Sequence, residues 1–159
     1  MRPLGALTSL LCLAALPALL VLYRTTDNYL ETTREIADLR FEIVDIHAED
    51  GPSGPVPAVT LVVHGPRRVS LRLAEVNFDL DWQGKTVASG LAYPNVSLLR
   101  NTDTTVTVRT TINQDYAAQT RALLASGQAP FALNGRARVL LPQGDVPVWL
   151  ELHGAPRGG

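Results

Sequence analysis

The sequence predicts an all-β fold, an antiparallel β-sandwich of the immunoglobulin or fibronectin type with one short helix, preceded by an N-terminal transmembrane helix. Three observations predict this arrangement. From Leu39 onward, apolar and polar residues alternate with a period of two, as in half-buried strands. Turns rich in Gly and Pro separate about seven such segments. Before them lies one uncharged apolar run, from Leu4 to Tyr23.

Composition limits the classes of function. The chain has 159 residues, of which 46% are apolar and 18% charged, as in an ordinary folded domain. Its 14 Lys and Arg against 15 Asp and Glu leave a net charge of -1, so no basic field is available to hold nucleic acid, and we expect no nucleic-acid partner. The one cysteine, Cys12, lies inside the apolar run, which excludes an intradomain disulfide and a cysteine zinc site.

The apolar run predicts a membrane anchor. Its 20 uncharged residues would span roughly 30 Å as a helix. A cleaved signal peptide is the alternative, but its apolar part is usually shorter and ends in small residues, whereas Leu, Val and Tyr follow Ala18 here. We therefore expect an uncleaved signal-anchor over residues 1–23, with the domain on the periplasmic or extracellular side. The predicted anchor residues are Leu4, Leu11, Leu16, Leu20 and Tyr23.

The remaining chain divides into three parts. Residues 24–38 are polar and free of Pro, and they predict a stalk that continues the helix. Residues 39–154 form the predicted sandwich, and 155–159 a flexible tail. The predicted loop over 49–57 is rich in Gly and Pro.

Within the sandwich, the long strand from Val69 to Trp82 changes its buried phase near Ala74, which predicts a β-bulge. Gln83 and Gly84 predict a tight hairpin turn into a strand over 85–91. Residues 104–113 alternate with β-branched side chains. A helix is expected over 115–126, ending at Gly127, and two strands follow over 131–141 and 146–152.

The sequence contains no recognisable catalytic pattern. The three histidines, His47, His64 and His153, fall near the ends of separate predicted strands and have no helical partner at metal-ligand spacing. Asn77, Asp79 and Asp81 alternate on an outward face, which fits either a plain polar face or a hard cation. There is no nucleophile elbow and no phosphate loop. The sequence therefore predicts a non-enzyme without catalytic residues, metal or cofactor.

Two groups of residues are candidate surface contacts. Arg67, Arg68 and Arg72 form a basic group near a loop, and Arg136 and Arg138 share one outward face. These arginines would meet lipid phosphates or an acidic partner, or lie on solvated faces.

Trp149 is the other candidate. It is apolar on a face that its neighbours predict to be wet, and it indicates a contact with a partner, the stalk or the membrane interface, or a cover over a second apolar cluster.

The order of these segments resembles the late-embryogenesis-abundant type 2 family, the water-stress and hypersensitive-response domain, over roughly residues 39–153. The stretch VSLRLAEVNFDLDWQGKTVASG, Val69 to Gly90, is similar to that family's long strand, Gly-containing turn and return strand. TTVTVRTTI and FALNGRARV fit the later strands. One departure is His64-Gly65-Pro66-Arg67 where the family has Asn-Pro-Asn. The resemblance implies a β-sandwich without catalytic residues, associated with desiccation and stress tolerance, and often anchored by one helix.

These observations favour a membrane-anchored, extracytoplasmic, non-catalytic domain of stress-protection type that binds or shields membrane or protein surfaces. The alternative is an accessory subunit of a larger membrane complex, such as a respiratory or photosynthetic one, with membrane lipid and other subunits as partners. A secreted binding domain freed by signal cleavage and a hydrolase are further rivals.

Overall fold

The computed structural model describes residues 21–27, 29–127, 130–141 and 144–154. Two compact units are present, residues 1–35 and 36–159. In the first unit, the described residues 21–27 and 29–35 are helical, and this segment includes much of the predicted stalk. The predicted tail over 155–159 lies outside the described residues.

The structure contradicts the predicted membrane helix. In the described ranges, no helix is both long and apolar enough to cross a bilayer. The helical residues carry charges at Arg24, Asp27 and Glu31, which the hydrocarbon interior disfavours. This finding overturns the N-terminal transmembrane helix and the single-pass localisation inferred from it. Tyr23 is 70% exposed in the helical segment 21–27. The other predicted anchor residues lie outside the described residues: Leu4, Leu11, Leu16 and Leu20.

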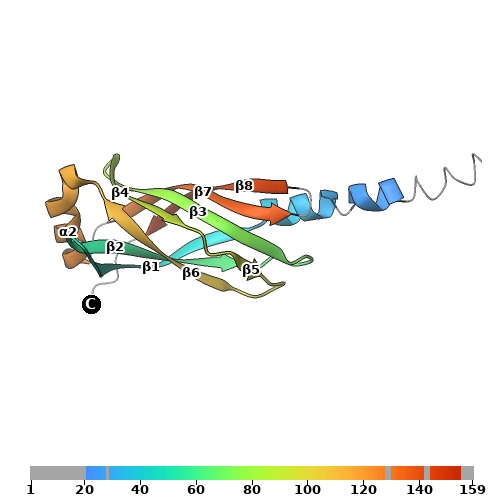
Figure 1. Ribbon diagram of the computed structural model, residues 1–159, viewed down its shortest axis with the longest axis horizontal. Helices are drawn as coiled ribbons and strands as arrows, with labels where there is room; N and C mark the ends of the chain where they lie inside the picture. Colours follow the sequence, from blue (N-terminus) through green and yellow to red (C-terminus); the bar gives the residue numbers. More distant parts are fainter. Residues whose placement is uncertain (1–20, 28, 128–129, 142–143, 155–159) are drawn as a thin grey trace, which may run out of the picture. The chain divides into compact units, whose positions relative to one another are not determined.

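From Arg40 onward, the described residues of the second unit form eight strands, one 3-10 turn and one α-helix (Figure 1). In chain order they are β1 Arg40–Gly51, β2 Gly54–His64, β3 Leu71–Trp82, β4 Lys85–Ala92, β5 Val96–Leu98, β6 Thr104–Ile112, η1 Gln114–Tyr116, α2 Ala117–Ser126, β7 Phe131–Leu141 and β8 Gly144–Gly154.

The predicted sandwich of two separate sheets is wrong, although the all-β class is right. The strands form one sheet in the order β1-β2-β6-β4-β3-β7-β8, with β5 on β3. Strand β6 joins the two halves of this sheet. Its residues Thr104–Arg109 pair with β2, and its end, Thr110–Ile112, pairs with β4. Because β6 pairs with strands of both halves, the sheet is continuous. This sheet curls into a half-barrel.

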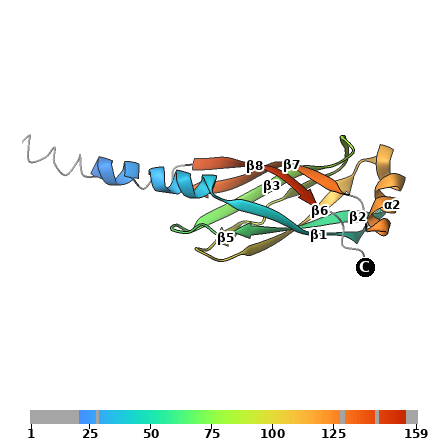
Figure 2. The ribbon, with the colours of Figure 1, turned by 180° about the vertical axis from the view of Figure 1, so that it is seen from behind.

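The two edge strands of the half-barrel come close together, as both ribbon views show (Figures 1 and 2). A Cβ built on Gly154 of β8 would lie 2.8 Å from Cγ2 of Ile43 on β1. No β1–β8 pairing occurs in the sheet. The edges therefore meet where the Ile43 side chain lies against the Gly154 backbone.

The core fills the concave side of the sheet. Alternating residues of every long strand point inward, which is the geometry that period-two patterns produce. The fully buried side chains include Phe78, Phe131, Ile46, Leu61, Leu73, Leu80, Leu98 and Leu133.

Local predictions in the long hairpin are confirmed. The register between β3 and β7 shifts between Leu73 and Glu75, as a bulge requires. Gln83 and Gly84 have φ values of 50° and 75°, both left-handed, as in the tight turn of a β3–β4 hairpin.

The helix ends where the sequence indicates, at Gly127, but it begins at Ala117, two residues later than predicted. The Asn113 side chain accepts a hydrogen bond from the Asp115 amide, and Gly127 ends α2 with a φ of 64°. The turn η1 precedes α2, so two short helices stand where one was predicted.

The predicted loop over 49–57 is wrong. β1 continues to Gly51 and β2 begins at Gly54, and these two residues are paired. The turn itself therefore occupies only Pro52 and Ser53, because two residues suffice to reverse an antiparallel pair. Both ribbon views place α2 beside this β1–β2 turn (Figures 1 and 2).

Candidate functional site

The convex side of the sheet carries a row of four neighbouring side chains, one from each of β4, β3, β7 and β8. The row is Leu91, Asn77, Arg136 and Trp149, and each residue is the Cα partner of the next. We name it the outer row. With neighbouring strands about 4.8 Å apart, the Cα atoms of Leu91 and Trp149 are roughly 14 Å apart.

Both ends of the outer row are exposed and apolar. Trp149 is 76% exposed and Leu91 is 51% exposed. Large apolar groups at this degree of exposure gain from contact with another surface. Trp149 therefore faces solvent and does not cover a second cluster of this unit.

A shallow hollow of about 250 Å³ lies beside Trp149, lined by Asn77, Phe78, Asp79, Asn134, Gly135, Arg136 and Trp149. Two of the predicted contact residues, Arg136 and Trp149, thus meet at one place. Their meeting depends on the register between β7 and β8.

Arg136 and Arg138 share a face but differ in ion pairing. Arg138 lies 3.0 Å from both Glu75 and Asp145, so its charge is neutralised. Arg136 makes no such ion pair within the part of the chain that the structure describes. Of these two arginines, only Arg136 therefore presents an uncompensated positive charge on the convex side.

The other predicted basic residues lie apart from this row. Arg67 and Arg68 are exposed in the connection between β2 and β3, and Arg72 is exposed near the start of β3, opposite Leu140 and Ser97. The five arginines do not form one patch.

Asp79 and Asp81 of the convex side are bound to neutral donors. Ser89 donates to Asp79 over 2.6 Å, and Asp81 accepts from Thr86 over 2.7 Å and from Asn134 over 2.9 Å. Across the described residues, no group of three or more potential metal ligands is present. Asp79 and Asp81 are therefore members of a hydrogen-bonded polar surface.

Two of the histidines lie between carboxylates. His47 contacts Asp45 at 2.8 Å through Nδ1 and Glu49 at 3.5 Å through Nε2. His64 contacts Asp103 at 2.9 Å and Glu42 at 3.6 Å. Because β1 is longer than predicted, His47 lies within that strand and not at its end.

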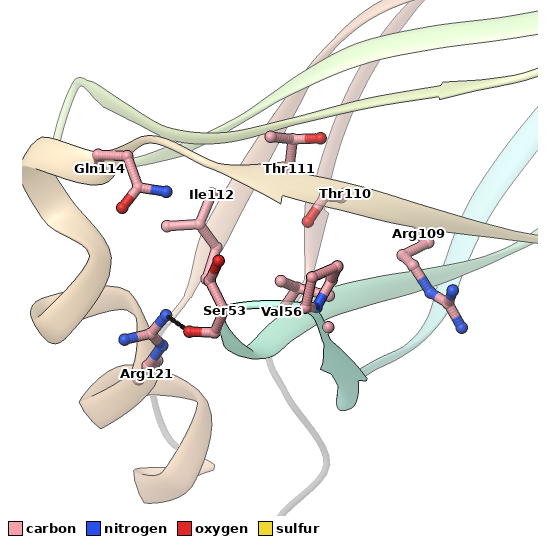
Figure 3. Close-up of a pocket in the computed structure, with 10 residues that line it drawn as sticks. Ser53, Val56, Arg109, Thr110, Thr111, Ile112, Gln114 and Arg121 are labelled. Atoms are coloured by element: carbon pink, nitrogen blue, oxygen red, sulfur yellow. Dashed lines mark hydrogen bonds between the residues drawn. The ribbon is translucent and has the colours of Figure 1, made fainter.

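A pocket of about 380 Å³ lies between the β1–β2 turn, the end of β6 and α2, and we name it the α2 pocket (Figure 3). Its lining residues are Gly51, Pro52, Ser53, Val56, Arg109, Thr110, Thr111, Ile112, Gln114 and Arg121. The sequence did not predict it, because it joins segments far apart in the chain.

Arg121 links α2 to the β1–β2 turn at the wall of this pocket. It extends from α2 toward the turn, and its Nη2 donates to the Ser53 carbonyl oxygen over 2.6 Å (Figure 3). Its Nε donates to the Pro55 carbonyl oxygen over 3.4 Å. At the same pocket, Thr110 is buried and donates to the Pro57 carbonyl oxygen over 2.7 Å.

Arg109 forms the second basic group of the pocket. Its Nε and Nη2 lie 2.8 and 2.7 Å from Glu49 Oε2. The hydrogen bond from Arg109 lowers the pKa of Glu49 from its ordinary 4.5, and His47 adds a smaller effect. The charge of Arg109 is therefore compensated.

No family model and no curated protein matches the chain. Solved structures do. A protein of Arabidopsis thaliana solved in solution matches with a TM-score of 0.57 and 15% identity, over 74% of this chain and 80% of that one. A protein provisionally described as late embryogenesis abundant matches with a TM-score of 0.50 and 17% identity, over 91% and 86%.

At these identities the likeness concerns the fold alone. The chain therefore shares its β-sheet fold with a protein that is provisionally described as late embryogenesis abundant, which agrees in part with the resemblance over residues 39–153.

Proposed function

We propose that this protein is a non-catalytic, stress-protection domain of late-embryogenesis-abundant type that shields the surfaces of other proteins. The observation that carries the proposal is the outer row, where the exposed Trp149 lies beside the unpaired Arg136. The shared fold with a protein of that type supports it.

The chemistry of the outer row suits a protein surface. Trp and Arg are the side chains that most often contribute strongly to protein interfaces. The hollow beside them is lined by the amides of Asn77 and Asn134, which carry no charge, and by the carboxylate of Asp79. A surface of this kind suits contact with the surfaces of other proteins, as a protective protein requires.

The proposed function involves no chemical reaction. We propose that the domain acts by contact alone, without a cofactor and without nucleic acid. The net charge of -1 argues against a polyanionic partner.

The proposal is tested by drying lactate dehydrogenase with the full chain and measuring the recovered activity. The control is an equal mass of a folded protein of similar size. We expect the full chain to preserve several times more activity than the control. Equal recovery with both proteins would contradict the proposal.

A further inference from the structure

The α2 pocket contains one cation, the guanidinium of Arg121, whose charge no carboxylate of the described residues neutralises. Arg121 donates to the carbonyl oxygens of Ser53 and Pro55, and these carry no net charge. Along the described chain, no carboxylate lies within 4.0 Å of its guanidinium, whereas Arg109 in the same pocket is paired with Glu49. The pocket therefore keeps one net positive charge.

The guanidinium of Arg121 is held in place before any ligand binds. Gly54 has a left-handed φ of 107°, and a Cβ there would lie 3.3 Å from Arg121 Cζ. The guanidinium thus lies against bare backbone, fixed by two carbonyl oxygens. A donor group positioned in advance loses little conformational entropy when it binds a ligand.

The rest of the lining is apolar or neutral. Val56, Pro52 and Ile112 contribute apolar groups, while Thr111 and Gln114 contribute a hydroxyl and an amide. No Asp or Glu is among the lining residues. The volume of about 380 Å³ is at the small end of the range of roughly 300–1,000 Å³ for small-molecule sites.

We infer that the α2 pocket binds a small organic anion, a carboxylate on a short apolar or aromatic body. The carboxylate pairs with the free N–H groups of Arg121, since a guanidinium matches two carboxylate oxygens well. The apolar body lies against Val56, Pro52 and Ile112. The neutral Gln114 and Thr111 limit the repulsion of an anion at the pocket mouth.

This site is separate from the outer row. Its residues come from the end of β1, the β1–β2 turn, β2, β6, η1 and α2, whereas the outer row comes from β4, β3, β7 and β8. The inference therefore does not depend on the proposed protective function, and either can fail alone.

The test is a titration of the full ¹⁵N-labelled chain with benzoate, followed by amide NMR, with benzamide as the neutral probe of the same shape. We expect saturable shifts at Thr111, Gln114 and Arg121, and at least tenfold weaker binding of benzamide. No saturable shift, or equal binding of the two probes, would overturn the inference.

Two variants locate the site. Arg121→Gln should weaken benzoate at least tenfold, while Arg100→Gln, which removes an exposed positive charge elsewhere, should leave the affinity unchanged. Thr111→Trp fills the pocket without removing Arg121, and it should abolish binding even if Arg121→Gln does not fold. Undiminished binding to the Thr111→Trp variant would overturn the location.

Inorganic phosphate separates an organic-anion site from a general anion site. Phosphate should bind at least tenfold more weakly than benzoate, because it gains nothing from the apolar wall. Phosphate binding as tight as benzoate would overturn the requirement for an apolar body.

Discussion

The ring of Phe78 on β3 occupies the space that a side chain of Gly90 on β4 would need. The two residues are directly opposite each other, and a Cβ on Gly90 would lie 2.6 Å from Phe78 Cζ. Gly135 on β7 is opposite Phe78 on the other side. The large ring thus packs between two strands that carry no side chain beside it, and this explains the glycine at the end of the Val69 to Gly90 stretch.

Gly90→Ala should destabilise the domain by about 1–3 kcal/mol, the usual cost of overfilling a tight core. The added methyl group displaces the ring of Phe78, which is only 1% exposed. The free energy of unfolding in urea measures the effect.

The Phe78→Leu background is the matched control for this substitution. Phe78→Leu removes the end of the ring that a Cβ on Gly90 would meet. In this background Gly90→Ala should therefore lower the free energy of unfolding by less than it does with Phe78 present. An unchanged cost in both backgrounds would place the strain outside this pair.

Thr110→Val should lower stability by about 1–2 kcal/mol. Thr110 is 4% exposed, and its loss leaves the Pro57 carbonyl oxygen without its hydrogen-bond donor. Thr107→Val on the exposed side of the same strand is the control, and it should change stability much less. Chemical unfolding of the two variants compares them, and an equal effect would show that the buried bond contributes nothing.

The contact between Glu49 and Arg109 should make stability depend on pH in acid. The pKa of Glu49 is lowered below 4.5 in the folded state, mainly by Arg109. The folded state therefore gains stability from this group above about pH 4.5, and the gain is lost as the pH falls through the folded pKa.

Urea unfolding at about pH 6 and about pH 3 measures this dependence in the wild type and in Arg109→Gln. The variant should lose less stability on acidification than the wild type. A wild type and variant with identical pH profiles would contradict the assignment to Arg109.

Much of the strand content follows from the sequence, because alternation directly reports one buried face. The bulge near Ala74, the turn at Gln83 and Gly84, and the stop at Gly127 are local features, and local residues are enough to predict them. The short β5 lacks a sufficient length of alternation and was not predicted.

The arrangement of the strands could not be predicted from local patterns. One continuous sheet and two separate sheets give the same alternation along each strand. The difference lies in β6, where Thr110 pairs with β4 although Arg109 pairs with β2. Such a switch depends on contacts between distant segments.

The candidate site was predictable only in part, because it too depends on contacts between distant segments. Trp149 stood out as an apolar residue at a wet position, but its pairing with Arg136 depends on a strand register. Leu91 and Arg121 gave no signal in the sequence. Their roles arise only when β4 meets β3 and α2 meets the β1–β2 turn.

The substitution Trp149→Ala separates the proposed role of the outer row from stability. Because Trp149 is 76% exposed, its removal should change the free energy of unfolding by less than about 0.5 kcal/mol. Leu99→Ala removes another exposed apolar side chain, which lies outside the outer row, and serves as the matched control.

The most direct test is the recovered activity of lactate dehydrogenase dried with the wild type, Trp149→Ala or Leu99→Ala. We predict that the wild type and Leu99→Ala protect equally, whereas Trp149→Ala loses more than half of the protection while remaining folded. Full protection by Trp149→Ala would contradict the claim that this protein shields other proteins through its outer row.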